Sequence, residues 1–158
     1  MMDIDKIVDR YSSVHKKMGG IALHIPGIVL LYLGVMGLLW VVPNELIVRW
    51  AGTNEYARWS LVLVILMVLV YGSMSFYLTF AIGLFMFGQL MAVEWLFNNY
   101  PEYFMQAVVG SLIGGLLLIV ASNALEKCLK NTILDLKRVA FGPAWMFGLL
   151  FRQLGISL

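Results

Sequence analysis

Charged residues leave four long stretches of this 158-residue chain without any Asp, Glu, Lys or Arg. These stretches cover residues 18–44, 59–93, 103–125 and 139–151, and they contain 27, 35, 23 and 13 residues. A helix needs about 20 apolar residues to cross the hydrocarbon core of a bilayer. The first and third stretches therefore each fit one membrane span, the second fits two spans joined by a tight turn, and the fourth is short for a span.

This pattern predicts an all-α integral membrane protein, a single domain built as a bundle of about four transmembrane helices. The predicted spans cover residues 21–42, 59–76, 79–97 and 103–125. The turn between the second and third spans is expected in or just after residues 71–77, because this is the least apolar part of the stretch.

Three shorter segments flank the predicted spans. Residues 3–17 place apolar side chains at helical spacing opposite charged ones, which predicts an amphipathic helix on the membrane surface. Residues 126–138 are polar and basic with an apolar side, and we predict a second amphipathic segment there. Residues 139–154 are apolar again and predict a short C-terminal helix.

The composition supports the membrane class and excludes others. Apolar residues make up 61% of the chain and charged residues 13%, whereas about 25% of the residues in a soluble domain are charged. The net charge of +2 is too small to indicate nucleic acid as a partner. The single cysteine, Cys128, excludes an internal disulfide framework.

Basic residues predict the orientation in the membrane. Four precede the first span and four follow the fourth, whereas the loops at the opposite ends of the spans hold only Arg49 and Arg58. The positive-inside rule then places both termini in the cytoplasm. The short loops favour a bacterial inner membrane, and an endoplasmic reticulum membrane is also compatible with the sequence.

Polar side chains at membrane depth are costly and are therefore functional candidates. His24, Ser122, Asn123 and Glu126 are all expected at the cytoplasmic end of the bundle, with His15 just outside it. On one continuous helix, His15 and His24 would be about 13 Å apart on opposite faces.

A bend at Gly19–Gly20 would be needed to bring the two histidines together. Imidazole is a common iron or zinc ligand, and Glu126 could complete such a site as a catalytic carboxylate. The plainer interpretation makes His24 a hydrogen-bonding core residue and Glu126–Lys127 an interfacial ion pair.

Gly110 and Gly114 form a small-xxx-small pair in the fourth predicted span, extended by Ser111 and Gly115. Small residues at this spacing allow two helices to approach closely in lipid. We expect them to pack inside this bundle, and a homo-oligomer through Gly110 and Gly114 is the alternative.

Three short motifs are similar to a known family. Tyr11-x3-His15-x8-His24 with Pro26, Leu125-Glu126-Lys127, and Pro143 about one span later resemble a small membrane family in order and spacing. That family includes a yeast endoplasmic-reticulum dioxygenase of 2-hydroxy fatty acids and bacterial relatives. The resemblance implies a multi-span helical fold and Fe(II)-dependent α-oxidation, in which dioxygen removes one carbon from a 2-hydroxy acyl chain.

The chain differs from the family at further positions. Gly20 stands in place of an asparagine, and Ser122 and Asn98 stand in place of histidines, so His15 and His24 are the only histidines here. Two functions therefore stay open. One is an Fe(II)-dependent enzyme with metal ligands His15 and His24, a carboxylate at Glu126 and an acyl chain or membrane lipid as partner. The other is a non-catalytic scaffold or subunit of a lipid-related complex, and a small transporter is a weaker third.

Overall fold

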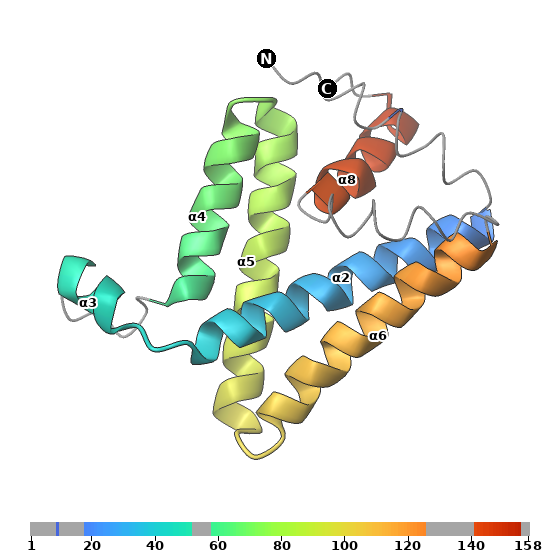
Figure 1. Ribbon diagram of the computed structural model, residues 1–158. Helices are drawn as coiled ribbons and strands as arrows, with labels where there is room; N and C mark the ends of the chain where they lie inside the picture. Colours follow the sequence, from blue (N-terminus) through green and yellow to red (C-terminus); the bar gives the residue numbers. More distant parts are fainter. Residues whose placement is uncertain (1–8, 10–17, 52–57, 126–140, 156–158) are drawn as a thin grey trace.

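In the computed structural model, residues 9, 18–51, 58–125 and 141–155 are described (Figure 1). All regular structure in these ranges is helical. The elements in chain order are α2 (Met18–Val41), α3 (Glu45–Ala51), α4 (Trp59–Gly72), α5 (Phe76–Asn99), α6 (Phe104–Leu125) and α8 (Gly142–Gln153). The predicted amphipathic segments 3–17 and 126–138 lie outside these ranges, except for Asp9.

Three of the described helices are long and apolar enough to cross a membrane. α2 and α5 each have 24 residues and α6 has 22. At 1.5 Å per residue, 24 residues give about 36 Å, which exceeds the hydrocarbon thickness of about 30 Å. The prediction of an all-α protein with membrane-spanning helices is therefore confirmed for these three segments.

The second predicted span is shorter than expected. α4 has 14 residues and ends at Gly72 instead of residue 76, so it is about 21 Å long. A turn at residues 73–75 follows, and α5 begins at Phe76, three residues earlier than expected. Because α4 alone is too short to cross the hydrocarbon, a fourth span stays a prediction.

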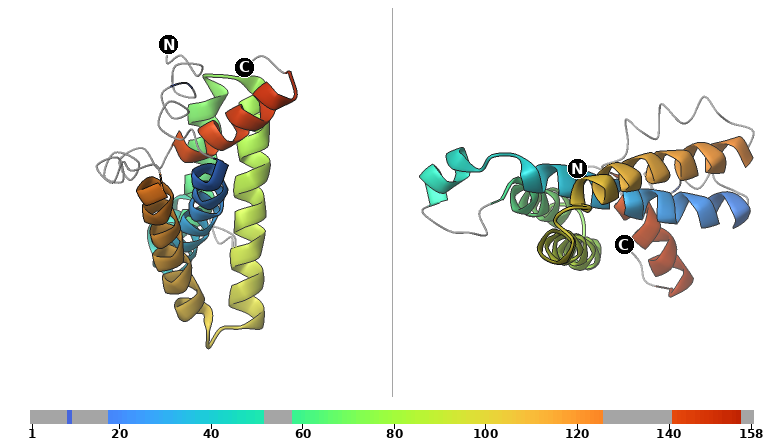
Figure 2. Two further views of the ribbon diagram at one scale, coloured as in Figure 1. Left: turned by 90° about the vertical axis from the view of Figure 1, so that its right-hand side faces the viewer. Right: turned by 90° about the horizontal axis from the view of Figure 1, so that it is seen from below.

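The helices form two antiparallel pairs, α2 with α6 and α4 with α5. α5 and α6 are joined by a short turn and diverge from it, and α8 lies in the opening, where it packs against α5 and α2 (Figures 1 and 2). α8 covers most of the predicted tail helix 139–154. At 12 residues, or about 18 Å, it is too short to cross a membrane alone.

Glycines make the close approach of α2 to α6 possible. A Cβ atom built on Gly115 would lie 2.7 Å from the Leu31 nitrogen and 2.8 Å from the Gly27 carbonyl oxygen. A Cβ atom on Gly34 would lie 2.5 Å from Leu112 Cγ. Backbone therefore meets backbone across this interface, as small residues allow in membrane helix pairs.

The expectation that Gly110 and Gly114 provide the internal packing is wrong for Gly110. A Cβ atom there would meet nothing within 4 Å, and at Gly114 it would make an ordinary contact of 3.7 Å with Leu30. The reason is the rotation of α6, which turns Val108, Gly115, Ile119 and Ser122 into the core. Of the predicted small-residue stripe, only Gly115 is in tight contact, and oligomerisation through Gly110 and Gly114 stays a prediction.

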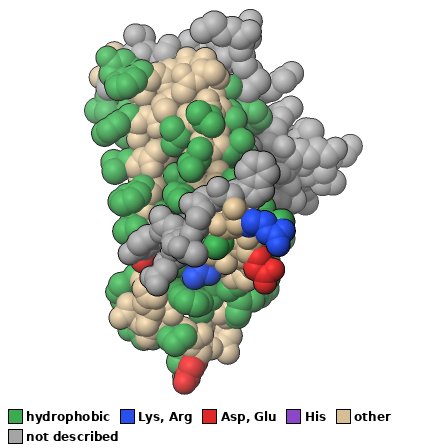
Figure 3. All heavy atoms as spheres, turned by 90° about the vertical axis from the view of Figure 1, so that its left-hand side faces the viewer, with side chains coloured by type: hydrophobic (Ala, Val, Ile, Leu, Met, Phe, Trp, Pro, Cys, Tyr) green, Lys and Arg blue, Asp and Glu red, His purple; other side chains and the backbone are tan. Residues whose placement is uncertain are grey.

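The outer surface is apolar over large areas. Figure 3 shows apolar side chains spread over one face, with the charged side chains in view gathered in its lower half. Large apolar side chains that are more than half exposed occur on α4, α5 and α6 and include Leu69, Phe80, Leu84 and Leu117. A contiguous apolar exterior of this extent is compatible with lipid as the surrounding solvent.

Candidate polar site at the α2–α6–α8 junction

The start of α2 and the end of α6 meet in a buried polar cluster. The Ser122 hydroxyl donates a hydrogen bond of 2.8 Å to the Gly20 carbonyl oxygen. His24 is 1% exposed, and Ser122 and Asn123 are both 0% exposed. Three of the five candidate polar residues from the sequence therefore lie buried at one end of the α2–α6 pair.

The start of α2 contains the two glycines at which a bend would be needed to bring His15 and His24 together. Met18, Gly19 and Gly20 already belong to the helix, which continues through Pro26 to Val41. Gly19 and Gly20 therefore lie within the first turn of α2 and do not interrupt it, and His15 lies outside the described residues. Gly20 is buried, and its carbonyl accepts the hydrogen bond from Ser122 on α6.

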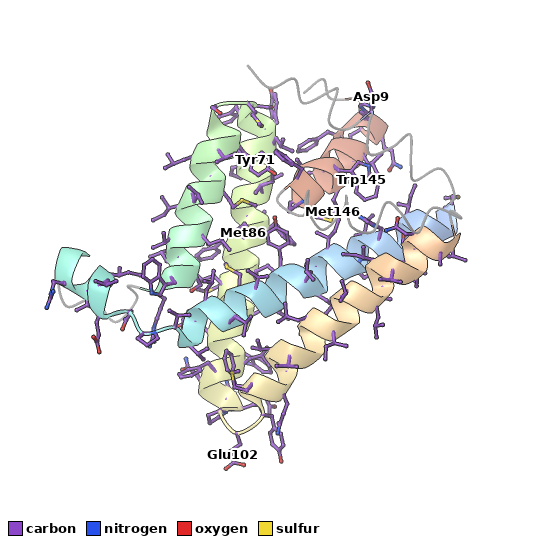
Figure 4. The ribbon with its side chains drawn as sticks, viewed as in Figure 1. Asp9, Tyr71, Met86, Glu102, Trp145 and Met146 are labelled. Carbon is purple, nitrogen blue, oxygen red and sulfur yellow. The ribbon has the colours of Figure 1, made fainter. Side chains whose placement is uncertain are left out.

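The closure of the cluster by α8 was not expected from the sequence. The ring of Trp145 lies edge-on to the His24 ring, with the centroids 5.3 Å apart and an interplanar angle of 88°. Trp145 is completely buried, and Figure 4 shows it on α8 next to Met146. Gly142 lies against Ile28, where a Cβ atom would be 3.1 Å from the Ile28 Cδ1 atom. The first turn of α8 thus packs against α2 at His24 and, one helical turn further along α2, at Ile28.

An open groove lies between α2 and α8, which diverge towards the C-terminal end of α8 (Figures 1 and 2). Its volume is about 470 Å³. The lining is almost entirely apolar and consists of Met18, Ile21, Ala22, Ile25, Met146, Phe147, Leu149, Leu150 and Gln153. Since Gly142 lies at Ile28 and Trp145 at His24, the groove extends from Ile25 and Met146 towards Met18 and Gln153.

Among the residues that the structure describes, an ion pair lies at the outer end of this groove. Arg152, next to Gln153, forms an ion pair of 2.7 Å with Asp9. Both side chains are exposed, so the pair adds little stability. It does place part of the N-terminal segment beside the last turn of α8. The groove therefore has an apolar interior and a polar end.

The structure describes one of the three residues of the predicted metal site. His15 and Glu126 lie outside the described residues, and His24 is the member of the set that the structure describes. Within the described ranges, no group of three or more His, Cys, Asp or Glu side chains could hold a metal ion. His24 alone is not a complete donor set for iron.

Sequence reasoning also missed Gln89. Gln89 lies on α5 with its side chain buried, and the Oε1 atom has no hydrogen-bond partner among the described residues. A signal was present, because Gln89 is the one strongly polar residue of α5 between Thr79 and Glu94. A polar amide at this depth is costly in lipid, and it marks a second polar point in the core, apart from His24.

Loss of the Ser122 hydroxyl is expected to weaken the α2–α6 junction. Ser122→Ala removes the hydrogen bond from α6 to the Gly20 carbonyl of α2 and should lower the free energy of unfolding by about 0.5–1.5 kcal/mol. The measurement is thermal unfolding in detergent, followed by size-exclusion chromatography. Ser73→Ala is the matched control, because Ser73 is exposed and bonds the Val70 carbonyl of its own helix. Equal losses in the two variants would contradict the role of Ser122.

Comparison of the chain with known protein families, with curated proteins and with solved structures found no match.

Proposed function

We propose that this protein binds the acyl chain of a fatty acid or membrane lipid in the α2–α8 groove. The observation that carries the proposal is the position of the groove, which runs along the start of α2 and ends at Ile25, the residue that follows the buried His24. An apolar lining with few polar groups is typical of sites for apolar ligands. The apolar lining suits the acyl chain, and Gln153 and the Arg152–Asp9 ion pair make the outer end of the groove polar.

The specific reaction that we propose is Fe(II)-dependent oxidation of a 2-hydroxy fatty acid, with loss of one carbon. His15 and His24 would hold the iron and Glu126 would supply a carboxylate, as the family resemblance implies. Iron with open coordination positions supplies the dioxygen chemistry. Pro26 adds a feature within the groove, because it has no N–H and leaves the Ala22 carbonyl without its usual helical donor. That carbonyl could accept a hydrogen bond from a 2-hydroxyl group.

A non-catalytic lipid-binding scaffold is the second candidate. The edge-on packing of His24 against Trp145 favours the scaffold, because a histidine that packs against a buried aromatic ring has a structural role that requires no bound metal. Both candidates require the groove to hold an acyl chain, and they differ in whether His24 binds iron.

Acyl-chain binding is tested with a 2-hydroxy fatty acid that carries a photoreactive diazirine near the end of its chain. We expect labelling of α2 within residues 18–25 and of α8 within residues 146–153 in the full chain. Ala22→Phe places a ring in the groove and should reduce labelling about tenfold, which corresponds to about 1.4 kcal/mol. Ala121→Phe is the matched control, because Ala121 is exposed on α6 away from the groove. Labelling that is unaffected by Ala22→Phe would overturn the proposal.

Iron binding separates the two candidates. For the enzyme we expect iron in the purified protein and a product shortened by one carbon, both lost in His24→Ala although the variant elutes like wild type. Iron at background in wild type, with groove labelling intact, would favour the scaffold and reject the dioxygenase.

A further inference from the structure

Unpartnered hydrogen-bond donors gather where the end of α2 meets the start of α4. The Trp40 Nε1, Arg58 Nε and Ser60 Oγ atoms are buried and have no hydrogen-bond partner among the described residues. Trp40 is 7% exposed and Ser60 is 0% exposed. Polar groups buried without a partner are rare in native proteins and are costly in lipid. Each of these three groups is therefore left in need of an acceptor.

Two contacts bring the donors together. The Trp59 indole N–H donates a hydrogen bond of 2.9 Å to the Pro43 carbonyl oxygen, which fixes the start of α4 to the chain just after α2. The Arg58 guanidinium lies over the Trp40 ring, 5.3 Å from its centroid. Arg58 and Ser60 flank Trp59 in sequence, so all three donors belong to residues at the junction of α2 with the start of α4, at the opposite end of α2 from His24.

The first turn of α4 adds backbone donors to the same region. Arg58 is the N-cap residue and makes no side-chain capping bond. Its carbonyl accepts the Leu61 and Val62 N–H groups at 3.0 and 3.3 Å, whereas the Trp59 and Ser60 N–H groups have no acceptor within the helix. The N-terminal end of a helix carries a partial positive charge and favours anions.

The chemistry of the donors defines the class of ligand. Two of the three side-chain atoms can only donate, the serine hydroxyl can donate, and the guanidinium carries a positive charge. The described residues offer no carboxylate partner to Arg58. A phosphate group has enough acceptor oxygens for several donors at once, and arginine is well suited to phosphate recognition. Trp40 ends an apolar helix, a position typical of the headgroup level of a bilayer.

We propose that Arg58, Ser60 and Trp40, together with the N-terminal turn of α4, form a binding site for a phosphate group. Its source is either a phospholipid headgroup or free phosphate. The site is independent of the acyl-chain groove, which lies at the other end of α2.

Native mass spectrometry of the detergent-solubilised full chain tests this site with phosphatidylglycerol, and with diacylglycerol as the phosphate-free control lipid. We expect retention of phosphatidylglycerol but not of diacylglycerol. Trp40→Phe keeps an aromatic ring under Arg58 and removes only the N–H group. Ser60→Ala removes the hydroxyl, and Arg58→Gln removes the charge. Each variant should lower the affinity about tenfold or more.

Arg49→Gln is the matched control, because it removes an exposed arginine from the neighbouring α3. It should leave the affinity unchanged. Equilibrium dialysis with radiolabelled inorganic phosphate identifies the source. Phosphate binding that Trp40→Phe and Ser60→Ala weaken, without lipid retention, supports the site with free phosphate as its ligand. Retention of lipid and phosphate that is equal in wild type, Trp40→Phe and Ser60→Ala would overturn the proposal.

Discussion

Gly115→Leu is expected to destroy the α2–α6 interface. Even a single Cβ atom at this position would lie within 3.0 Å of two backbone atoms of α2, the Leu31 nitrogen and the Gly27 carbonyl oxygen. Backbone atoms of a long helix cannot move aside individually, so the helices must separate along their length. Overpacking of a core typically costs about 1–3 kcal/mol, occasionally more. We expect Gly115→Ala to fall within this range and Gly115→Leu to leave no folded bundle.

The matched control is Gly110→Leu on the same helix, where a Cβ atom would meet nothing within 4 Å. It should unfold at the wild-type temperature or above, since leucine is a better helix former than glycine. Thermal unfolding in detergent, read by size-exclusion chromatography, gives the stabilities. The apparent mass in the same experiment tests the predicted homo-oligomer, because Gly110→Leu would disrupt contacts between copies. Equal stability of Gly115→Ala and wild type would contradict the interface described above.

Trp145→Ala is expected to have the second-largest effect on stability. Trp145 is completely buried, and its removal leaves a large cavity between α8 and the start of α2. Substitutions of this kind cost about 3–5 kcal/mol. The loss also removes the edge-on contact with His24, so the short α8 should detach from the longer helices.

Trp145→Phe should recover part of the stability, because a smaller aromatic ring can keep an edge-on contact with His24. Trp95→Ala is the matched control, because the Trp95 side chain is 55% exposed on α5. Detachment of α8 is measured by limited proteolysis after residue Arg152, which should become faster in Trp145→Ala and stay unchanged in Trp95→Ala. A Trp145→Ala variant with wild-type stability and a wild-type cleavage rate would show that Trp145 does not hold α8 against α2.

The hydropathy of the sequence predicted most of the helical segments. Charge-free stretches place α2, α5 and α6 within a few residues, because the thickness of a bilayer fixes the length of a spanning helix. The length of α4 was not predicted well. The turn at residues 73–75 lies within the least apolar part of the stretch, where it was expected, but no charged residue marks where α4 ends and α5 begins, so the helix bounds were several residues off.

The rotation of α6 could not be predicted from a small-residue motif. Gly110, Gly114 and Gly115 all satisfy the pattern, and only the docking of α2 decides that Gly115 faces inwards. Because the helix is apolar on every side, no polar stripe reveals which face meets protein and which meets lipid.

The candidate site was predicted in part. His24, Ser122 and Asn123 were expected at one end of the bundle because each is a polar residue at the same end of an apolar span, and all three are buried there. Trp145 was missed, since an aromatic residue in an apolar tail gives no sign that it will pack against a histidine 121 positions earlier. The donors at Trp40, Arg58 and Ser60 were missed for a similar reason, because their burial depends on how α4 docks.

The pairing of the helices also has a consequence for the order of assembly during synthesis. α4 and α5 are separated by residues 73–75 only, so this hairpin can close as soon as both helices have entered the membrane. α2 meets its main partner, α6, after residues 42–103 have been made. Until then, the glycine face of α2 has no protein to pack against. We therefore expect α2 to depend on the insertion machinery or a membrane chaperone until α6 arrives, and assembly to be slowest at this step.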